Sequence, residues 1–250
     1  MPGAFTRLAN PARFEAVSRP LVPAFGLAAL GLLAAGAYLS LFASPPDHRQ
    51  GEAVRIMYVH VPAAWLAMQA YAVVAAASLM GFVWRHRLAD VAAREALPLG
   101  LAFTVLALAT GAIWGRVTWG VWWDWDPRLT SMLVLAFLYA GLIAVWQVLP
   151  EAQAARIAAL MAMLGAVNLP IIKFSVDWWD SLHQKATVIR PDGPAMPAEM
   201  LWPLGLMTMG YAVLFAFVLT LRMRTALAAR RARPAPPAPS RAVLEPAGAA

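Results

Sequence analysis

Two histidines, His60 and His183, are the side chains of this sequence best suited to coordination chemistry. A neutral imidazole ring carries a lone pair that binds transition-metal ions. His60 lies in the segment MYVHVPAAW at residues 57–65, and His183 lies in DWWDSLHQ at residues 177–184, so each has tryptophans nearby. Taken alone, either histidine is also consistent with a hydrogen-bonding residue at a membrane surface. Their similar surroundings indicate a common site.

Tryptophan is concentrated between the two histidines. Five of the eleven tryptophans fall within twelve residues, at Trp114, Trp119, Trp122, Trp123 and Trp125. An aromatic belt at the membrane–water interface is one interpretation, although a belt scatters its tryptophans over many helix ends. If the segment is a shallow helix, residues 114, 118, 121, 122 and 125 share one face and form a flat platform. Two imidazoles beside an aromatic platform predict a haem held at the membrane surface.

Other polar residues give weaker signals. His48 follows Pro-Pro-Asp in a loop, where we expect it to be solvated, and His86 lies between two arginines on the opposite side of the membrane. Haem carries two propionates, which the guanidinium fork of arginine binds well. Arg55, Arg116 and Arg128 are the candidates for this contact, and a loop salt bridge with Asp124 or Asp126 is the alternative for each.

Six apolar stretches predict an all-α membrane protein with six transmembrane helices. The chain is 61% hydrophobic and only 13% charged, whereas soluble domains carry about 25% charged residues. Each stretch is close to the length of about 20 residues that crosses a bilayer. They are residues 21–43, 62–84, 96–114, 129–149, 155–174 and 200–221. The fifth is the weakest, because Asn168 and Pro170 interrupt it.

Basic residues predict the orientation of these spans. We expect residues 1–20 to be a cytoplasmic segment before a retained signal anchor. Thirteen of the 20 Lys and Arg residues then fall on the inner side and seven on the outer side, as the positive-inside rule expects. This places both termini in the cytoplasm, and the loops at 114–130 and 174–199 outside. Residues 222–250 become rich in Ala and Pro and are predicted to be a disordered cytoplasmic tail.

Composition disfavours several other functions. The net charge of +7 follows from the membrane topology and does not indicate nucleic-acid binding, so we expect lipid and not nucleic acid as a partner. The spans contain almost no ionisable residues, which argues against an ion-coupled transporter. The chain has no cysteine, no phosphate-binding loop of the G-x-x-x-x-G-K type and no H-E-x-x-H or G-x-S-x-G motif.

The string Trp119-Gly-x-Trp122-Trp123-x-Trp125-Asp126-x-Arg128-Leu-Thr resembles the signature of the tryptophan-rich haem-handling membrane proteins of cytochrome c maturation. Within that group, the six spans and the two histidine segments resemble the maturation protein C family, also called haem exporter protein C. The resemblance extends from about Tyr58 to Leu221. It implies that His60 and His183 are axial ligands of a non-covalent, b-type haem. It also implies a haem site that includes the following residues: Trp114, Trp119, Trp122, Trp123, Trp125, Asp126, Arg128 and Arg55.

The resemblance further implies a location and partners. It predicts a bacterial inner-membrane protein that holds haem at the periplasmic face and presents it to a periplasmic haem chaperone, maturation protein E. The expected partners in the membrane are the ABC transporter subunits, maturation proteins A and B, and a one-span subunit, maturation protein D. The chain itself is expected not to be an enzyme.

Three alternatives use the same residues differently. A haem permease would move haem through the spans, although these lack polar residues. A lyase-like enzyme subunit of the same system shares the tryptophan signature but has a longer chain with more spans. A quinol-oxidising haem b subunit places histidine pairs inside its spans, and no span here has a histidine at mid-depth.

Overall fold

The computed structural model describes residues 10–185 and 187–232, and this part of the chain is almost entirely α-helical. Six helical stretches are long and apolar enough to cross a membrane, which confirms the predicted all-α fold of a multi-pass membrane protein. The helices are α2 (Pro11–Tyr38, with a π-helical turn Leu39–Ala43), α3 (Met57–Trp84, preceded by a 3-10 turn Glu52–Ile56), α4 (Arg87–Trp119), α5 (Pro127–Val148), α6 (Glu151–Gly165), α7 (Asn168–Trp178) and α8 (Ala198–Ala232).

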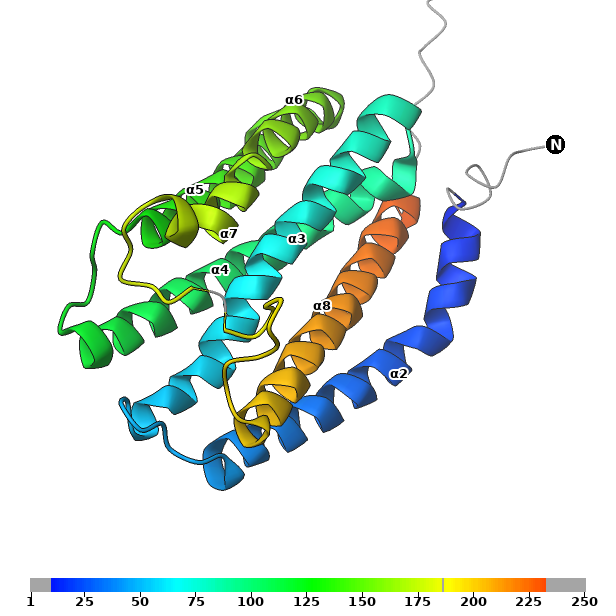
Figure 1. Ribbon diagram of the computed structural model, residues 1–250. Coiled ribbons are helices and arrows are strands. Elements are labelled where there is room, and N and C mark those ends of the chain that lie inside the picture. Colours follow the sequence, from blue (N-terminus) through cyan, green and yellow to red (C-terminus); the bar gives the residue numbers. More distant parts are fainter. Residues whose placement is uncertain (1–9, 186, 233–250) are drawn as a thin grey trace, which may run out of the picture.

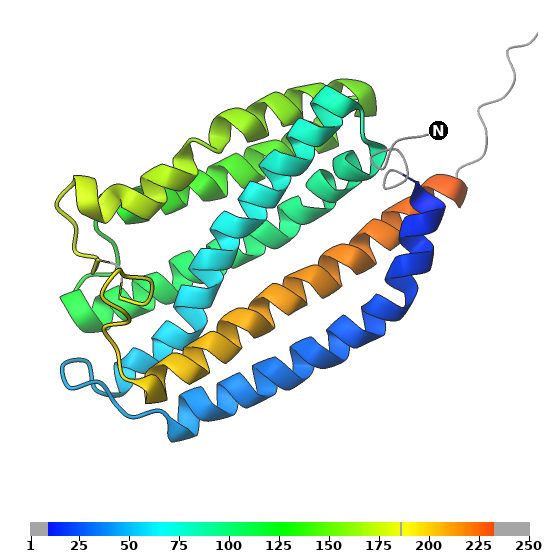
Figure 2. The ribbon, with the colours of Figure 1, turned by 45° about the vertical axis from the view of Figure 1, so that its right-hand side comes forward.

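Helices α3 and α4 run side by side through the centre of the bundle, with α8 and α2 on one side and α5, α6 and α7 on the other (Figures 1 and 2). Buried tyrosines join the central helices. The Tyr139 hydroxyl on α5 donates to the Ala67 carbonyl on α3 at 2.8 Å, and its ring meets Tyr71 edge-on at 5.1 Å. Gly100 on α4 leaves room for the Tyr139 ring. Small residues of this kind allow close approach of membrane helices.

The fifth span is broken, as its sequence predicted. Helix α6 ends at Gly165 and α7 begins at Asn168, with a turn between them. The buried Asn168 side chain donates to the Ser131 carbonyl on α5 at 2.9 Å. The neighbouring helix therefore supplies a polar partner at the break, which is the condition for tolerating one inside a membrane.

Several helices extend beyond the predicted spans. Helix α4 continues to Trp119, so Trp114 and Trp119 belong to a helix and not to a loop. It ends because Gly120 adopts a left-handed conformation, with φ of 82°. Residues 120–126 form no helix, so the shallow amphipathic helix considered for residues 114–125 does not exist. The flat aromatic face that depended on it is therefore absent.

The first and last helices are also longer than the predicted spans. Helix α2 begins at Pro11, capped by the Asn10 side chain, so half of the predicted N-terminal segment is helical. Helix α8 continues to Ala232, so residues 222–232 of the predicted disordered tail are helical. Residues 1–9 of the predicted cytoplasmic segment and residues 233–250 of the predicted disordered tail lie outside the described residues.

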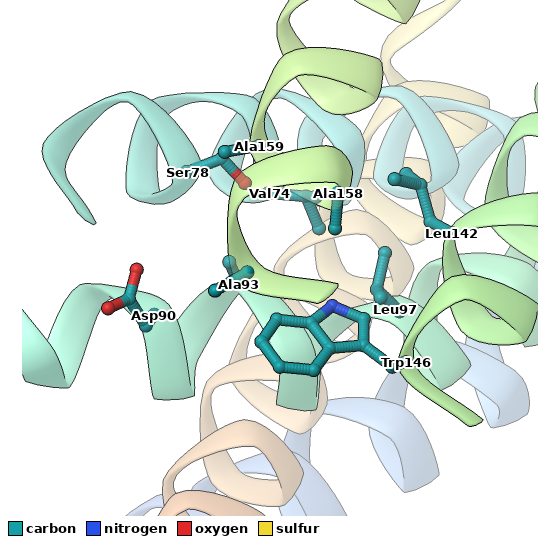
Figure 3. Close-up of a pocket in the computed structure, with 10 residues that line it drawn as sticks. Val74, Ser78, Asp90, Ala93, Leu97, Leu142, Trp146, Ala158 and Ala159 are labelled. Atoms are coloured by element: carbon teal, nitrogen blue, oxygen red, sulfur yellow. The ribbon is translucent and has the colours of Figure 1, made fainter. Parts of the chain in front are cut away.

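Three loops lie together at one end of the bundle (Figures 1 and 2). They are residues 44–51, 120–126 and 179–197, which connect α2 to α3, α4 to α5 and α7 to α8. A small cavity lies toward the other end, between α3, α4, α5 and α6 (Figure 3). It is lined mainly by Ala, Val and Leu, together with Ser78, Asp90 and Trp146. No histidine reaches it, so the imidazole chemistry belongs to the loop end.

Candidate functional site

His60 lies in the first turns of α3, with its ring against α4. Its Nδ1 atom is 3.0 Å from the Ala107 carbonyl oxygen and 3.2 Å from the Thr110 hydroxyl. The Thr110 hydroxyl itself donates to the Leu106 carbonyl at 2.7 Å, so it accepts from His60. Both partners of Nδ1 are therefore acceptors, which places the ring proton on Nδ1 and leaves the lone pair on Nε2.

The His60 ring is also enclosed by α4 side chains. A Cβ atom at Gly111 would lie 2.9 Å from His60 Cε1, so the glycine provides the space that the ring occupies. The Trp114 indole meets the imidazole edge-on at a centroid distance of 5.6 Å. Its Nε1 donates to the Gln50 side chain at 2.8 Å, which ties the 44–51 loop to the same place.

Asp126 is the centre of the second half of the site. It caps the N-terminus of α5, and its side chain is only 1% exposed. Its carboxylate accepts five hydrogen bonds from two separate parts of the chain. The donors are the backbone N–H groups of Arg128 (2.8 Å), Leu129 (3.3 Å) and Leu182 (3.0 Å), the Ser181 hydroxyl, and His183 Nδ1 (3.1 Å).

His183 is oriented by this carboxylate. Because Nδ1 donates to Asp126 Oδ1, the free lone pair of the ring is on Nε2, as in His60. The Trp119 indole, at the end of α4, meets the imidazole edge-on with a centroid distance of 5.0 Å. A metal-ligating histidine is commonly fixed in this way, by a carboxylate or carbonyl bonded to its other nitrogen.

The charge states agree with this assignment. Burial would raise the pKa of Asp126, but the Ser181 hydroxyl, His183 and two backbone N–H groups together hold it below its ordinary value. The side chain is therefore an ionised acceptor at neutral pH. Burial lowers the pKa of His183 and outweighs the opposing effect of Asp126. His183 is therefore neutral at pH 7, which is the state that ligates iron.

The structure brings both histidines and Arg128 together. His183 and Arg128 both contact Asp126, through Nδ1 at 3.1 Å and a backbone N–H at 2.8 Å, and the indoles against His60 and His183, Trp114 and Trp119, lie on the same helix α4. The Arg128 guanidinium donates to the Lys173 carbonyl at 3.3 Å. In the part of the chain that the structure describes, it forms no ion pair with Asp126, which it contacts through its backbone N–H. Its charge is thus available to an anionic ligand.

The other two arginines are engaged locally. Arg55 pairs with Glu52 and donates to the Ser40 carbonyl at 2.5 Å. Arg116 donates to the Gly120 carbonyl. The alternative of a salt bridge to Asp124 or Asp126 is not formed by either, among the contacts of the described residues. Arg128 differs from both, because its guanidinium reaches the Lys173 carbonyl on α7 and forms no ion pair among the described residues.

The loop tryptophans differ in exposure. Trp122 is 60% exposed and Trp125 is 74% exposed, so both present indole surface outward. Trp123 is partly buried and meets Trp125 edge-on at 5.6 Å. The five tryptophans therefore divide into two that contact the histidines, Trp114 and Trp119, and a loop group whose outer members face away from the protein.

Four contributors were not singled out from the sequence. Thr110 and Gly111 position His60, Gln50 positions Trp114, and Ser181 positions His183 through Asp126. The only local signal was the Ser181-Leu-His183 spacing, in which the serine Oγ accepts the His183 backbone N–H at 3.1 Å. The other three act on residues far away in the sequence.

Both imidazoles have Nδ1 bonded within the chain, so both Nε2 atoms are left as donors to a metal centre. No group of three or more His, Cys, Asp or Glu side chains that could hold a bare metal ion occurs among the described residues. Two histidines suffice for the axial positions of a haem, whose porphyrin supplies the other ligands. The fold and site thus define a class: a multi-pass membrane protein with a paired-imidazole, tryptophan-rich site at one end.

Comparisons with known proteins identify the family within that class. The model of the family described as Heme exporter protein C matches residues 4–236. Heme exporter protein C of Bradyrhizobium diazoefficiens is 49% identical over 227 residues, covering 90% of this chain and 86% of that protein. The Escherichia coli protein of the same name is 40% identical over 220 residues, covering 87% and 88%. The Paracoccus denitrificans protein is 36% identical, covering 89% and 93%. The chain belongs to the Heme exporter protein C family.

Proposed function

We propose that this protein binds haem as its cargo, non-covalently, with His60 and His183 as the two axial ligands. The observation that carries the proposal is the shared state of the two rings. Each has its Nδ1 proton committed to an acceptor of the chain, the Ala107 carbonyl for one and Asp126 for the other. Each is therefore preset to offer Nε2 to iron. The name Heme exporter protein C, which the relatives carry, supports haem as the ligand.

The charge of Arg128 and the indoles complete the proposed site. Haem combines an apolar ring with two propionates, so it needs aromatic surface and a cation. Trp114 and Trp119 lie beside the two imidazoles, and Arg128 contacts the Asp126 carboxylate that holds His183. Arg55 contributes to the fold of its own segment through Glu52, so we place it outside the propionate contact.

We propose further that the site faces the periplasm of a bacterial inner membrane, with both termini in the cytoplasm. The distribution of Lys and Arg along the sequence supports this orientation, because the predicted topology assigns thirteen to the inner side and seven to the outer side. Haem held there would be handed to a periplasmic haem chaperone, maturation protein E. The membrane partners would be the ABC transporter subunits, maturation proteins A and B, and maturation protein D. We assign no catalytic residue to this chain.

The exposed indoles support transfer to a partner. A protein that only stored haem would be expected to bury its site, whereas Trp122 and Trp125 point outward beside this one. Exposed tryptophans are frequent anchors in protein interfaces. We therefore propose that the loop at residues 120–126 binds the chaperone as well as lining the haem site.

The ligand assignment is tested by substitution and absorbance. His60→Ala and His183→Ala should each lower the haem bound by the purified protein and shift its Soret band. His48→Ala is the matched control, because the His48 side chain is 80% exposed and pairs with Asp47. His86→Ala should also retain haem, although His86 caps α4. An unchanged spectrum in the double variant of His60 and His183 would disprove the assignment.

Chaperone capture is tested separately. Trp122→Ala and Trp125→Ala should reduce capture of the chaperone in a pull-down while haem remains bound. Trp202→Ala is the control, since Trp202 is 73% exposed but lies on α8, outside the loop. His183→Ala should show the opposite order and lose haem first. If the two loop variants lose haem but capture the chaperone normally, the loop only binds haem.

A further inference from the structure

The two histidines are held by different kinds of structure. His60 belongs to helix α3 and is fixed against α4 by the Ala107 carbonyl, Thr110 and Gly111. Ala107 is 2% exposed, so this contact lies within the core of the bundle. To move His60 by more than a side-chain rotation would require separating two packed membrane helices.

His183 belongs to a segment without helix or strand, residues 179–197 excluding residue 186. Among the described residues, every hydrogen bond from Ser181–His183 to another part of the chain ends on the Asp126 carboxylate. The His183 ring also contacts the edge of Trp119. One side chain therefore accepts all the hydrogen bonds by which Ser181–His183 reach the bundle, whereas Val188 and Met196, farther along the segment, pack against its apolar core.

Ser181 is the residue that completes this attachment. Its hydroxyl donates to Asp126 Oδ2, and its oxygen accepts the backbone N–H of His183. It thus joins the carboxylate to the backbone of the ligand residue as well as to the segment. Loss of the hydroxyl would leave the ring bonded to Asp126 with a less constrained backbone behind it.

We infer that His183, and not His60, is the axial ligand that leaves during haem transfer, and that Ser181 is the positioning residue that sets how readily it leaves. This inference rests on the proposed function. In the exchange step the bond between iron and His183 Nε2 breaks, and a lone pair from the incoming donor takes the vacated position. No electron is transferred, and the proton on Nδ1 stays there. His60 keeps the haem attached throughout.

Carbon monoxide is a suitable probe, because it binds a six-coordinate ferrous haem only after one axial ligand has left. Haem-loaded protein in detergent is reduced and mixed with carbon monoxide, and the rate is followed at the Soret band. Ser181→Ala should raise the rate about tenfold, the size expected for losing one hydrogen bond to a charged group. Ser181→Thr, which keeps the hydroxyl, should restore the original rate. Ser78→Ala, at the opposite end of the bundle, should leave the rate unchanged.

The comparison with His60 decides the identity of the leaving ligand. Thr110→Val removes a hydrogen bond from His60 and should raise the rate much less than Ser181→Ala. If Thr110→Val accelerates binding as much or more, or if Ser181→Ala has no effect, the inference is wrong. Either result would leave the proposed function intact as long as the wild-type protein shows six-coordinate haem before carbon monoxide is added. A wild-type spectrum without two axial imidazoles would instead overturn the proposed function.

Discussion

Replacing Asp126 by Asn tests the organisation of the site, because the change keeps the size of the side chain and removes its charge. The Asn oxygen can still accept from His183 and from the start of α5, where Oδ1 accepts now. The Asn amide group would then face the Leu182 N–H, and since both groups are donors, no hydrogen bond can form between them. An unsatisfied buried donor costs about 1–3 kcal/mol, and the His183 bond loses its charge assistance, roughly 1 kcal/mol more.

These terms predict a cost of about 3 kcal/mol, which corresponds to roughly 100-fold weaker haem binding. The assay is titration of purified protein with haem, followed at the Soret band, together with the spin state as a reporter of His183 ligation. Asp124→Asn is the matched control, since Asp124 is exposed, lies two residues away and undergoes the same change of charge. If Asp126→Asn binds haem within about twofold of Asp124→Asn, the carboxylate does not orient His183 and the reasoning fails.

Three further predictions follow from the same contacts. Gly111→Ala should weaken haem binding through His60, because the new Cβ would lie 2.9 Å from the ring and overpacking of this kind costs about 1–3 kcal/mol. Gly31→Ala is the control: nothing lies within 4 Å of its new Cβ, so it should have no effect in the same titration. Arg128→Lys keeps the charge but loses the guanidinium fork, so it should reduce haem retention on a desalting column more than Arg49→Lys does; equal losses would indicate general electrostatics. Alkaline phosphatase fused after Trp119 or Asp180 should be active, and after Arg87 or Arg231 inactive; activity at Arg231 would contradict an even number of spans.

The membrane fold could be predicted from the sequence because its signal is local. Each span is a continuous apolar run, and the break in the fifth follows from Asn168 and Pro170 inside that run. The error at the tryptophan segment also had a local cause. Gly120 ends α4, and Asp126 followed by Pro127 begins α5, so both boundaries were present in the sequence. These two end signals, and not the spacing of the tryptophans, determine where the helices stop and start.

The site was predicted by residue type but not by its connections. His60 and His183 stand out as imidazoles near tryptophan, whereas the contacts that fix their rings join residues 47 and 57 positions apart. Such contacts depend on how α3 packs on α4 and where the last loop lies. The contact of Arg55, by contrast, could be predicted from the sequence, because Glu52 lies three residues before it and charges at i and i+3 pair on a helical turn.

Holding and releasing a ligand place opposite demands on one site, and unequal support of the two histidines meets both. A closing free energy of about 3 kcal/mol would keep the His183 segment closed in roughly 99% of molecules. A partner that binds with a micromolar dissociation constant contributes about 8 kcal/mol, which exceeds that cost. Docking beside Trp122 and Trp125 could therefore open the Asp126 attachment, whereas separating α3 from α4 to free His60 would expose buried polar groups to the membrane. On this argument haem leaves from the loop side, and the bond between iron and His60 on α3 is the last to break.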